Sequence, residues 1–226
     1  FLTLDLYLVP IFLSQNLKFT TQTYAIGMKA LLGAGRLGEA DVLYEKAKEA
    51  GCGSVALANV LLQHFAQQKD MAMVQETWLR LEFDELKPDE MSYSLKMKAQ
   101  YHTNDLAGFF TTWEELKSTM PENITSLTYN LVTLTLAHNK EGERLKEVMS
   151  ELEAKYPTKE SRKKDIDIEQ SFLVGAGFRG DYQRIVKAVD ALHADGHRIM
   201  NQHCVAVLMG LCAAGNASPA GNFINH

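Results

Sequence analysis

The sequence predicts an all-α fold: an α-α superhelix, or solenoid, of about five to six helical hairpin repeats. Three observations support this prediction. A segment of about 35 residues recurs along the 226-residue chain,. Each copy contains two helix-like stretches joined by a polar or glycine-containing turn, and the second stretch carries the same apolar stripe from copy to copy. Repeats of this period stack on their neighbours and bury a continuous core.

The repeats follow one another along the chain. Repeat one is "TYAIGMKALLGAGRLGEADVLYEKAKEAG" from Thr23, and repeat two runs from Leu57 to Asp89 without the opening tyrosine. Repeat three begins at Ser92 and repeat four at Thr128, each again with Tyr in second place. A weaker fifth repeat begins near Ile166 and a partial sixth near Asn201, so we expect paired helices throughout this region.

The second helix of each repeat shows apolar residues with i, i+4, i+7 spacing, which is one face of an amphipathic helix. The three columns are Ala40, Val74, Phe109, Leu145 and Ile185; then Tyr44, Trp78, Trp113, Met149 and Val189; then Ala47, Leu81, Leu116, Leu152 and Leu192. The first helix is less regular, because its shared column of Leu31, Phe65, Leu136 and Ala176 has Gln100 in repeat three.

Two glycine patterns raise an alternative fold. Gly175, Gly177 and Gly180 match G-x-G-x-x-G, the phosphate-binding pattern of dinucleotide folds, and a second copy begins at Gly33,. That site needs a strand before the loop, and "IDIEQSFLV" is the candidate strand,. The repeat instead places Gly35 and Gly180 in one column, between the two helices, where glycine ends a helix in the left-handed conformation.

Composition bounds the organisation and the function. We expect an N-terminal segment at 1–20, the remnant of a preceding repeat or a partner-contacting extension, a repeat array at 21–216 and a C-terminal tail at 217–226. The net charge of −5 gives no overall basic field for nucleic acid or membranes,. Three cysteines argue against a disulfide framework, and the apolar opening is too short for a transmembrane segment,.

The repeats resemble the pentatricopeptide repeat family from about Thr20 to Asn216. The resemblance is carried by the first repeat, by "LKPDEMSYS" between repeats two and three, and by "SLTYNLVTLTLA". It implies an organellar location, in a mitochondrion or plastid. It also implies binding of single-stranded RNA, one base per repeat, read by two or three side chains. In the family's scheme one reading residue follows the Tyr of the first helix and another closes the repeat.

Carried over to this sequence, the scheme implies three pairs of nucleic-acid-binding residues: Asn59 with Asp89, Ser94 with Thr125, and Asn130 with Asp165. Asn59 with Asp89 is a combination typical of uridine-reading repeats. The alternative for each position is a structural one, since Asn, Ser and Asp also cap helices and form turns. A second candidate contact is the basic loop of Lys159, Arg162, Lys163 and Lys164, whose alternative role is a solvated linker,.

The charge pattern weakens the RNA interpretation. The family often has a lysine near the end of the first helix, and the matching residues here are Gly33, Gln67, His102, His138, Phe178 and Ala213. Phosphate contacts supply much of RNA affinity. The sequence therefore slightly favours a scaffold or accessory subunit that binds protein subunits of a larger organellar assembly, with single-stranded RNA binding as the alternative.

No catalytic motif is found, so we expect no enzyme activity, no cofactor and no small-molecule substrate. His193, His197, His203 and Cys204 form the one cluster with metal-ligand residue types,. Gly196 interrupts it where a helix is expected to end, so the histidines need not share a face, and we expect no metal site.

Overall fold

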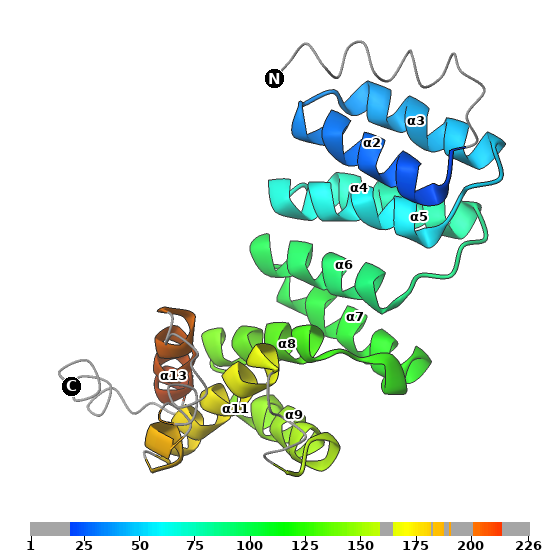
Figure 1. The fold of residues 1–226 in the computed structure, drawn as a ribbon. Coiled ribbons are helices and arrows are strands. Elements are labelled where there is room, and N and C mark those ends of the chain that lie inside the picture. The colour runs from blue at the N-terminus through cyan, green and yellow to red at the C-terminus, as the bar shows by residue number, and fades with distance from the viewer. Residues whose placement is uncertain (1–18, 159–164, 182, 188–189, 191–200, 214–226) are drawn as a thin grey trace. The chain divides into compact units, whose positions relative to one another are not determined.

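The computed structural model describes residues 19–158, 165–181, 183–187, 190 and 201–213. The chain divides into two compact units, unit 1 at Phe1–Pro121 and unit 2 at Glu122–His226. Within the described residues all regular elements are helices, so the all-α prediction is confirmed (Figure 1). The predictions for 1–18, for the basic loop 159–164 and for the tail 217–226 lie outside the described residues.

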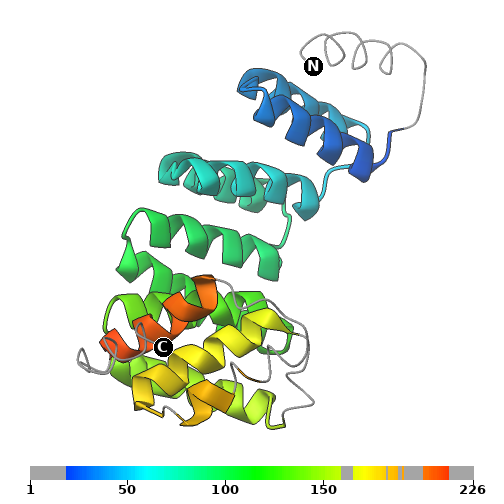
Figure 2. The same cartoon turned by 60° about the vertical axis from the view of Figure 1, so that its left-hand side comes forward.

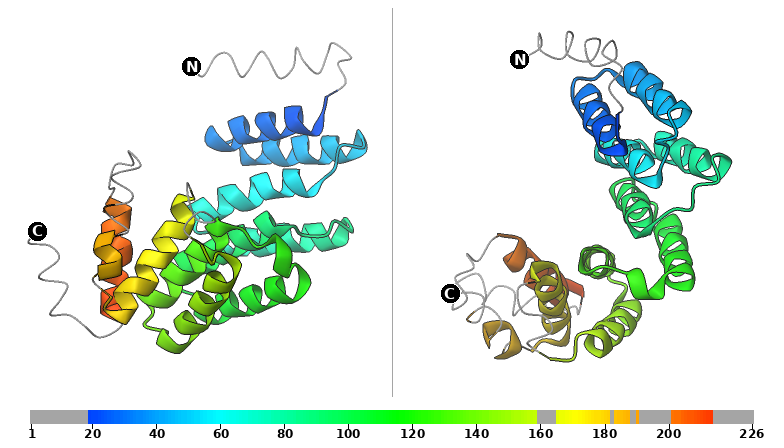
Figure 3. Two further views of the ribbon diagram at one scale, coloured as in Figure 1. Left: turned by 60° about the horizontal axis from the view of Figure 1, so that its bottom comes forward. Right: turned by 45° about the vertical axis from the view of Figure 1, so that its right-hand side comes forward.

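The described part of unit 1, from residue 19 onward, contains three helical hairpins, one for each of the first three repeats. Their helices are α2 (Thr21–Gly33) with α3 (Leu37–Glu49), α4 (Val55–Gln68) with α5 (Met71–Phe83), and α6 (Glu90–His102) with α7 (Leu106–Thr119). The first helices α2, α4 and α6 lie side by side, in contact with their neighbours (Figure 3). The predicted stacking of successive hairpins is therefore present in unit 1.

Unit 2 contains helices of repeats four and five and the helix that begins the predicted sixth repeat. Its described helices are α8 (Ser126–His138), α9 (Gly142–Lys155), α11 (Ile166–Arg179) and α13 (Asn201–Ala213), preceded by a 3-10 turn at Pro121–Asn123. The first helices α8 and α11 pack together, and α9 pairs with α8 as the second helix of repeat four. Helix α13 contacts both α8 and α11.

The apolar columns of the second helices form the core, as predicted. Each described member is at most 4% exposed, and the members are Ala40, Val74, Phe109, Leu145 and Ile185; Tyr44, Trp78, Trp113 and Met149; and Ala47, Leu81, Leu116 and Leu152. Val189 and Leu192 lie outside the described residues. Burial of such a stripe supplies the main favourable term that holds the helices together within each unit.

The two helices of each hairpin are joined by one recurring backbone turn. The residue at its centre has positive φ in all five repeats: Gly35, Lys69, Asn104, Lys140 and Gly180, with φ of 74°, 59°, 58°, 59° and 66°. The next N–H donates to a carbonyl five residues earlier, at 2.9–3.0 Å, in the manner of a Schellman cap,. The accepting carbonyls belong to Leu31, Phe65, Gln100, Leu136 and Ala176.

This turn decides the question raised by the glycine patterns. Gly35 and Gly180 occupy the left-handed position, as the repeat alignment predicts. Gly175 and Gly177 lie inside α11, and the segment that resembled a strand is the first part of that helix. The alternative dinucleotide fold is therefore wrong, because a helix stands where it needs a strand.

Gln100 is the polar exception in the first-helix column, and the structure buries it like the apolar residues it replaces. It is 3% exposed, and its Oε1 has no hydrogen-bond partner within the described residues. A buried polar atom without a partner destabilises the folded state. Repeat three therefore carries a local defect in an otherwise apolar column.

We expect Gln100→Leu to raise the free energy of unfolding by about 1–2 kcal/mol, because leucine restores the apolar column and removes the unpaired oxygen. Urea unfolding followed by circular dichroism measures the change. Gln63→Leu is the matched control: Gln63 is exposed on α4, and its replacement should change stability by less than about 0.5 kcal/mol,. A lower stability for Gln100→Leu would contradict this account of the column.

Candidate nucleic-acid interface

The structure brings together one predicted pair, Asn59 and Asp89, which are 30 residues apart in sequence. Asn59 lies near the start of α4, and Asp89 is the N-cap of α6, the neighbouring first helix. The Nδ2 of Asn59 donates to Oδ1 of Asp89 at 3.0 Å. The pair can form because α4 and α6 pack together with their starting residues side by side.

Ser92 completes this cluster and was not among the predicted residues. Its backbone N–H donates to Oδ1 of Asp89 at 2.9 Å, and its Oγ accepts from the Asp89 N–H at 3.2 Å, which is a capping box,. The Ser92 hydroxyl also donates to Oδ1 of Asn59 at 2.7 Å. The Asp-x-x-Ser spacing signals the cap in the sequence, but nothing there signals the bond to Asn59.

These bonds fix both the charge of Asp89 and the orientation of the Asn59 amide. Burial raises the pKa of Asp89, but the hydrogen bonds from Asn59 and Ser92 outweigh it and hold the pKa below its usual value. The carboxylate is therefore charged at neutral pH. With the amide nitrogen held by Asp89 and the oxygen held by Ser92, the Asn59 side chain presents a defined donor and acceptor.

The second predicted pair, Ser94 with Thr125, is divided between the two units. Ser94 lies on α6 in unit 1 and is 7% exposed. Thr125 belongs to unit 2 and is the N-cap of α8, where its hydroxyl accepts from the Thr128 N–H at 3.4 Å. For Thr125 the capping alternative therefore describes an observed contact.

The members of the third predicted pair, Asn130 and Asp165, have separate hydrogen-bond partners. The Nδ2 of Asn130 donates to Gln170 Oε1 at 2.8 Å and to Asp167 Oδ1 at 3.0 Å. Asp165 is the N-cap of α11 and accepts from the Ile168 N–H at 3.2 Å. Asn130 is the fifth residue of α8, as Asn59 is of α4, and Asp165 caps α11 as Asp89 caps α6, so the two pairs occupy the same places but make different contacts.

One turn beyond the reading positions, the first helices of unit 1 carry exposed polar side chains. These are Lys29, Gln63 and Lys98, each four residues after Ala25, Asn59 and Ser94 respectively; we call them the mid-helix row. Lys29 and Gln63 border a groove of about 270 Å³ between α2 and α4, with Leu32 and Val60 also in its lining. Positive charge is therefore present on this face, one turn earlier than the family's lysine.

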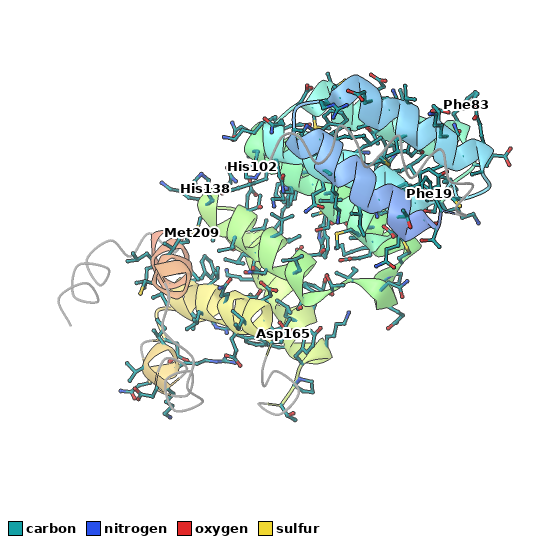
Figure 4. The ribbon with its side chains drawn as sticks, turned by 45° about the horizontal axis from the view of Figure 1, so that its top comes forward. Phe19, Phe83, His102, His138, Asp165 and Met209 are labelled. Carbon is teal, nitrogen blue, oxygen red and sulfur yellow. The ribbon has the colours of Figure 1, made fainter. Side chains whose placement is uncertain are left out.

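A second group of basic residues lies at the C-terminal ends of α4 and α6. It consists of Lys69, just after α4, with Lys98 and His102 on α6; Figure 4 labels His102. Partial burial, followed by the positive charges of Lys98 and Lys69, lowers the pKa of His102, so its imidazole is neutral at pH 7. Lys69 and Lys98 therefore carry the positive charge at the C-terminal ends of α4 and α6.

Lys96, the other lysine of α6, has a different role. Its Nζ lies 4.0 Å from the centre of the Trp78 ring, a cation–π contact,. Burial lowers its pKa despite the nearby Glu115 and Glu82. Lys96 is therefore part of the packing between α5 and α6, and Lys98 is the lysine of α6 that faces solvent.

The described residues contain no group of three or more His, Cys, Asp or Glu that could hold a metal ion. His193 and His197 lie outside the described residues, and the side chain of His203 is likewise not described. Within the described part of the chain, every helix is too short or too polar to cross a bilayer.

We expect Asp89→Ala to lower the free energy of unfolding by about 1–2 kcal/mol at pH 7, because it removes both the cap and the bond to Asn59. Since the folded-state pKa lies below the usual value of about 3.9, this stabilisation is present above that value and is lost as the pH falls through the folded-state pKa. Urea unfolding at pH 7 and at about pH 2.5 tests both statements.

Asp70→Ala is the matched control for the cap, because Asp70 caps α5 through the Met73 N–H without a partner like Asn59. Its cost at pH 7 should be smaller than that of Asp89→Ala. An Asp89→Ala difference that grows in acid would show that the carboxylate does not stabilise the folded state.

Comparison with known proteins adds the following findings. No family model matches the chain, and no curated protein sequence matches it. Among solved structures, it is similar to the pentatricopeptide repeat protein PPR10 in complex with an 18-nt psaJ RNA element. The identity is 17%, the TM-score is 0.47, and the match covers 98% of this chain and 36% of that chain. For PPR10 from maize the identity is 16%, the TM-score 0.35, and the coverage 98% and 40%. The chain thus spans well under half the length of these solved structures, which are pentatricopeptide repeat proteins.

Proposed function

We propose that unit 1 binds single-stranded RNA along α2, α4 and α6, and that Asn59 and Asp89 read a base, with uridine preferred. The observation that carries this proposal is the Asn59–Asp89–Ser92 cluster, in which two residues from neighbouring repeats are held together at the start of two first helices. A fixed amide beside a charged carboxylate is suited to the Watson–Crick edge of an unstacked base.

The hydrogen bonds within the cluster leave the Asn59 amide room for a base. An amide nitrogen has two N–H groups, and one is used by Asp89; an amide oxygen has two lone pairs, and one is used by Ser92,. One donor and one acceptor therefore remain. They match the adjacent acceptor and donor that uracil presents at O4 and N3–H. Asn59 is half-buried, so its amide can still be reached from solvent.

Apolar and basic groups near the cluster supply the other contacts that RNA needs. Met91, two residues after Asp89, is 45% exposed and offers an apolar surface to the face of a base,. Lys29 and Lys98 in the mid-helix row, and Lys69 beyond α4, offer charges to the phosphates. Because the chain as a whole carries −5, we expect this binding to be weak and sensitive to salt.

A second candidate function, a scaffold that binds protein subunits of a larger assembly, is favoured by an apolar surface elsewhere on unit 1. Leu79 and Phe83, one turn apart on α5, are 54% and 87% exposed. Figure 4 labels Phe83 and His102 at opposite ends of the hairpins. Exposed apolar patches commonly mark protein contacts. The two functions use different helices, so one does not exclude the other. The organellar location is proposed from the family resemblance alone.

We expect Asn59→Ala to weaken binding of a uridine-rich oligonucleotide about 10-fold, because the variant cannot form the hydrogen bonds to a base edge. Fluorescence anisotropy at low salt measures the affinity. Gln75→Ala, an exposed amide on the second helix α5, is the control and should bind like the unmodified protein. Absence of binding even at low ionic strength would remove the RNA proposal and leave the scaffold function.

We expect Lys29→Gln and Lys98→Gln together to flatten the salt dependence of binding, by about 0.7 in the slope of log K against log salt for each phosphate that is no longer neutralised. Affinities measured over a series of NaCl concentrations give the slope. Lys46→Gln, an exposed lysine of α3, is the control and should leave the slope unchanged. Equal slopes for the double variant and the control would show that the mid-helix row does not contact phosphate.

A further inference from the structure

The position that is exposed and polar in unit 1 is apolar and covered in unit 2. Lys29, Gln63 and Lys98 form the mid-helix row of unit 1, and the same alignment assigns Leu134 of α8 and Val174 of α11 to that position. Leu134 is half-buried, and Val174 is 0% exposed. This position is therefore exposed to solvent where it holds lysine or glutamine, and partly or fully buried where it holds leucine or valine.

Helix α13 packs close to this position. It packs on both α8 and α11, and Figure 2 shows it beside α11 within unit 2. The approach to α11 is unusually close, because a glycine from each helix lies at the crossing. A Cβ added to Gly177 would lie 2.6 Å from the Val207 carbonyl oxygen, and one added to Gly210 would collide with the Val174 carbonyl oxygen.

The sequence of α13 suits a covered position. "NQHCVAVLMGLCA" contains no aspartate, glutamate, lysine or arginine. Ala206, Val207 and Leu211 are each at most 1% exposed. A helix with this composition is stable when it is packed against other apolar surface. The apolar surfaces of α13 and α11 therefore pack against each other where Gly177 and Gly210 let the two backbones approach closely.

The reading positions of unit 2 are also occupied from within. Asn130 and Gln170, the equivalents of Asn59, are 7% and 5% exposed and bond to each other. Thr133 and Ser171 continue the contact between α8 and α11, with their hydroxyl oxygens 3.3 Å apart. In unit 1, Ser94 at this position is likewise 7% exposed, whereas the Asn59 amide is half-buried while bonded to Asp89 and Ser92.

We infer that α13 is a built-in cover for unit 2, which takes the place along α8 and α11 that RNA would follow. It limits the RNA contact surface to α2, α4 and α6 of unit 1. The limit on the RNA contact surface rests on the proposed function, whereas the covering of Val174 by α13 does not. The interaction surface for a nucleic-acid strand is thus shorter than the number of repeats implies.

Thiol labelling tests the cover without RNA. Val174→Cys and Gln63→Cys are each treated with a maleimide, and mass spectrometry of peptides separates the new thiol from the native cysteines. We expect position 174 to react at least about 50-fold more slowly than position 63, since reaction requires α13 to move away. Equal rates would overturn the inference.

A second variant links the slow rate to α13. Gly210→Leu, added to Val174→Cys, introduces a side chain that collides with α11 and should bring the rate at 174 to within a few-fold of that at 63. Unchanged slow labelling would mean that α13 is not the cover. Gly210→Ala is the milder variant should Gly210→Leu unfold unit 2, because a Cβ at position 210 already collides with the Val174 carbonyl oxygen.

Crosslinking tests the extent of the RNA surface. A uridine-rich oligonucleotide with 4-thiouridine is irradiated with the full chain, and crosslinked peptides are identified. We expect crosslinks in 21–102 and none in α8 or α11; crosslinks in α8 or α11 would overturn the inference. If the oligonucleotide binds nowhere, the proposed function and the RNA part of the inference both fail, while the labelling rates still decide whether α13 covers Val174.

Discussion

Burial of the second-helix stripe against the first helices is the interaction on which the rest of the structure depends. The stripe places an apolar residue, then an aromatic residue or Met, then a second apolar residue at fixed spacing, and its described members are almost fully buried. The stripe can pack on the first helix because the same turn, with a residue of positive φ at its centre, joins the two helices of each hairpin. Two of the five turns use glycine, whereas Lys69, Asn104 and Lys140 adopt positive φ, since the cap bond to the preceding helix offsets the steric cost,.

This packing has a direct consequence for function. It places the start of one first helix beside the start of the next, so that a side chain near the start of one helix can reach the N-cap residue of its neighbour. Asn59 and Asp89 meet in this way, and Ser92 fixes their geometry. Capping and base reading are thus compatible roles for Asp89, because one carboxylate oxygen serves the helix and the amide while the other is not used by these bonds.

The two units differ in what they do with the same repeat. In unit 1 the first helices present an amide, an acid and lysines to solvent. In unit 2 the equivalent positions form a polar contact between α8 and α11 and an apolar contact with α13. Substitution of lysine and glutamine by leucine and valine at one column accounts for the difference, because apolar side chains at that column are stabilised by a covering helix.

The sequence by itself determined the helical class, the repeated pairing of helices, the buried columns and the turns at Gly35 and Gly180, because these follow from periodicity and local backbone preference. It also predicted Asn59 with Asp89 as a pair, and the two side chains are hydrogen-bonded to each other. Only the tertiary structure decided which residues meet across repeats: Asn130 contacts Asp167 and Gln170 of α11, because the packing of α8 on α11 brings these side chains within reach. The exposed lysines one turn before the expected column, and the cover of Val174 by α13, likewise depend on how neighbouring helices pack, which the periodicity of single helices does not encode.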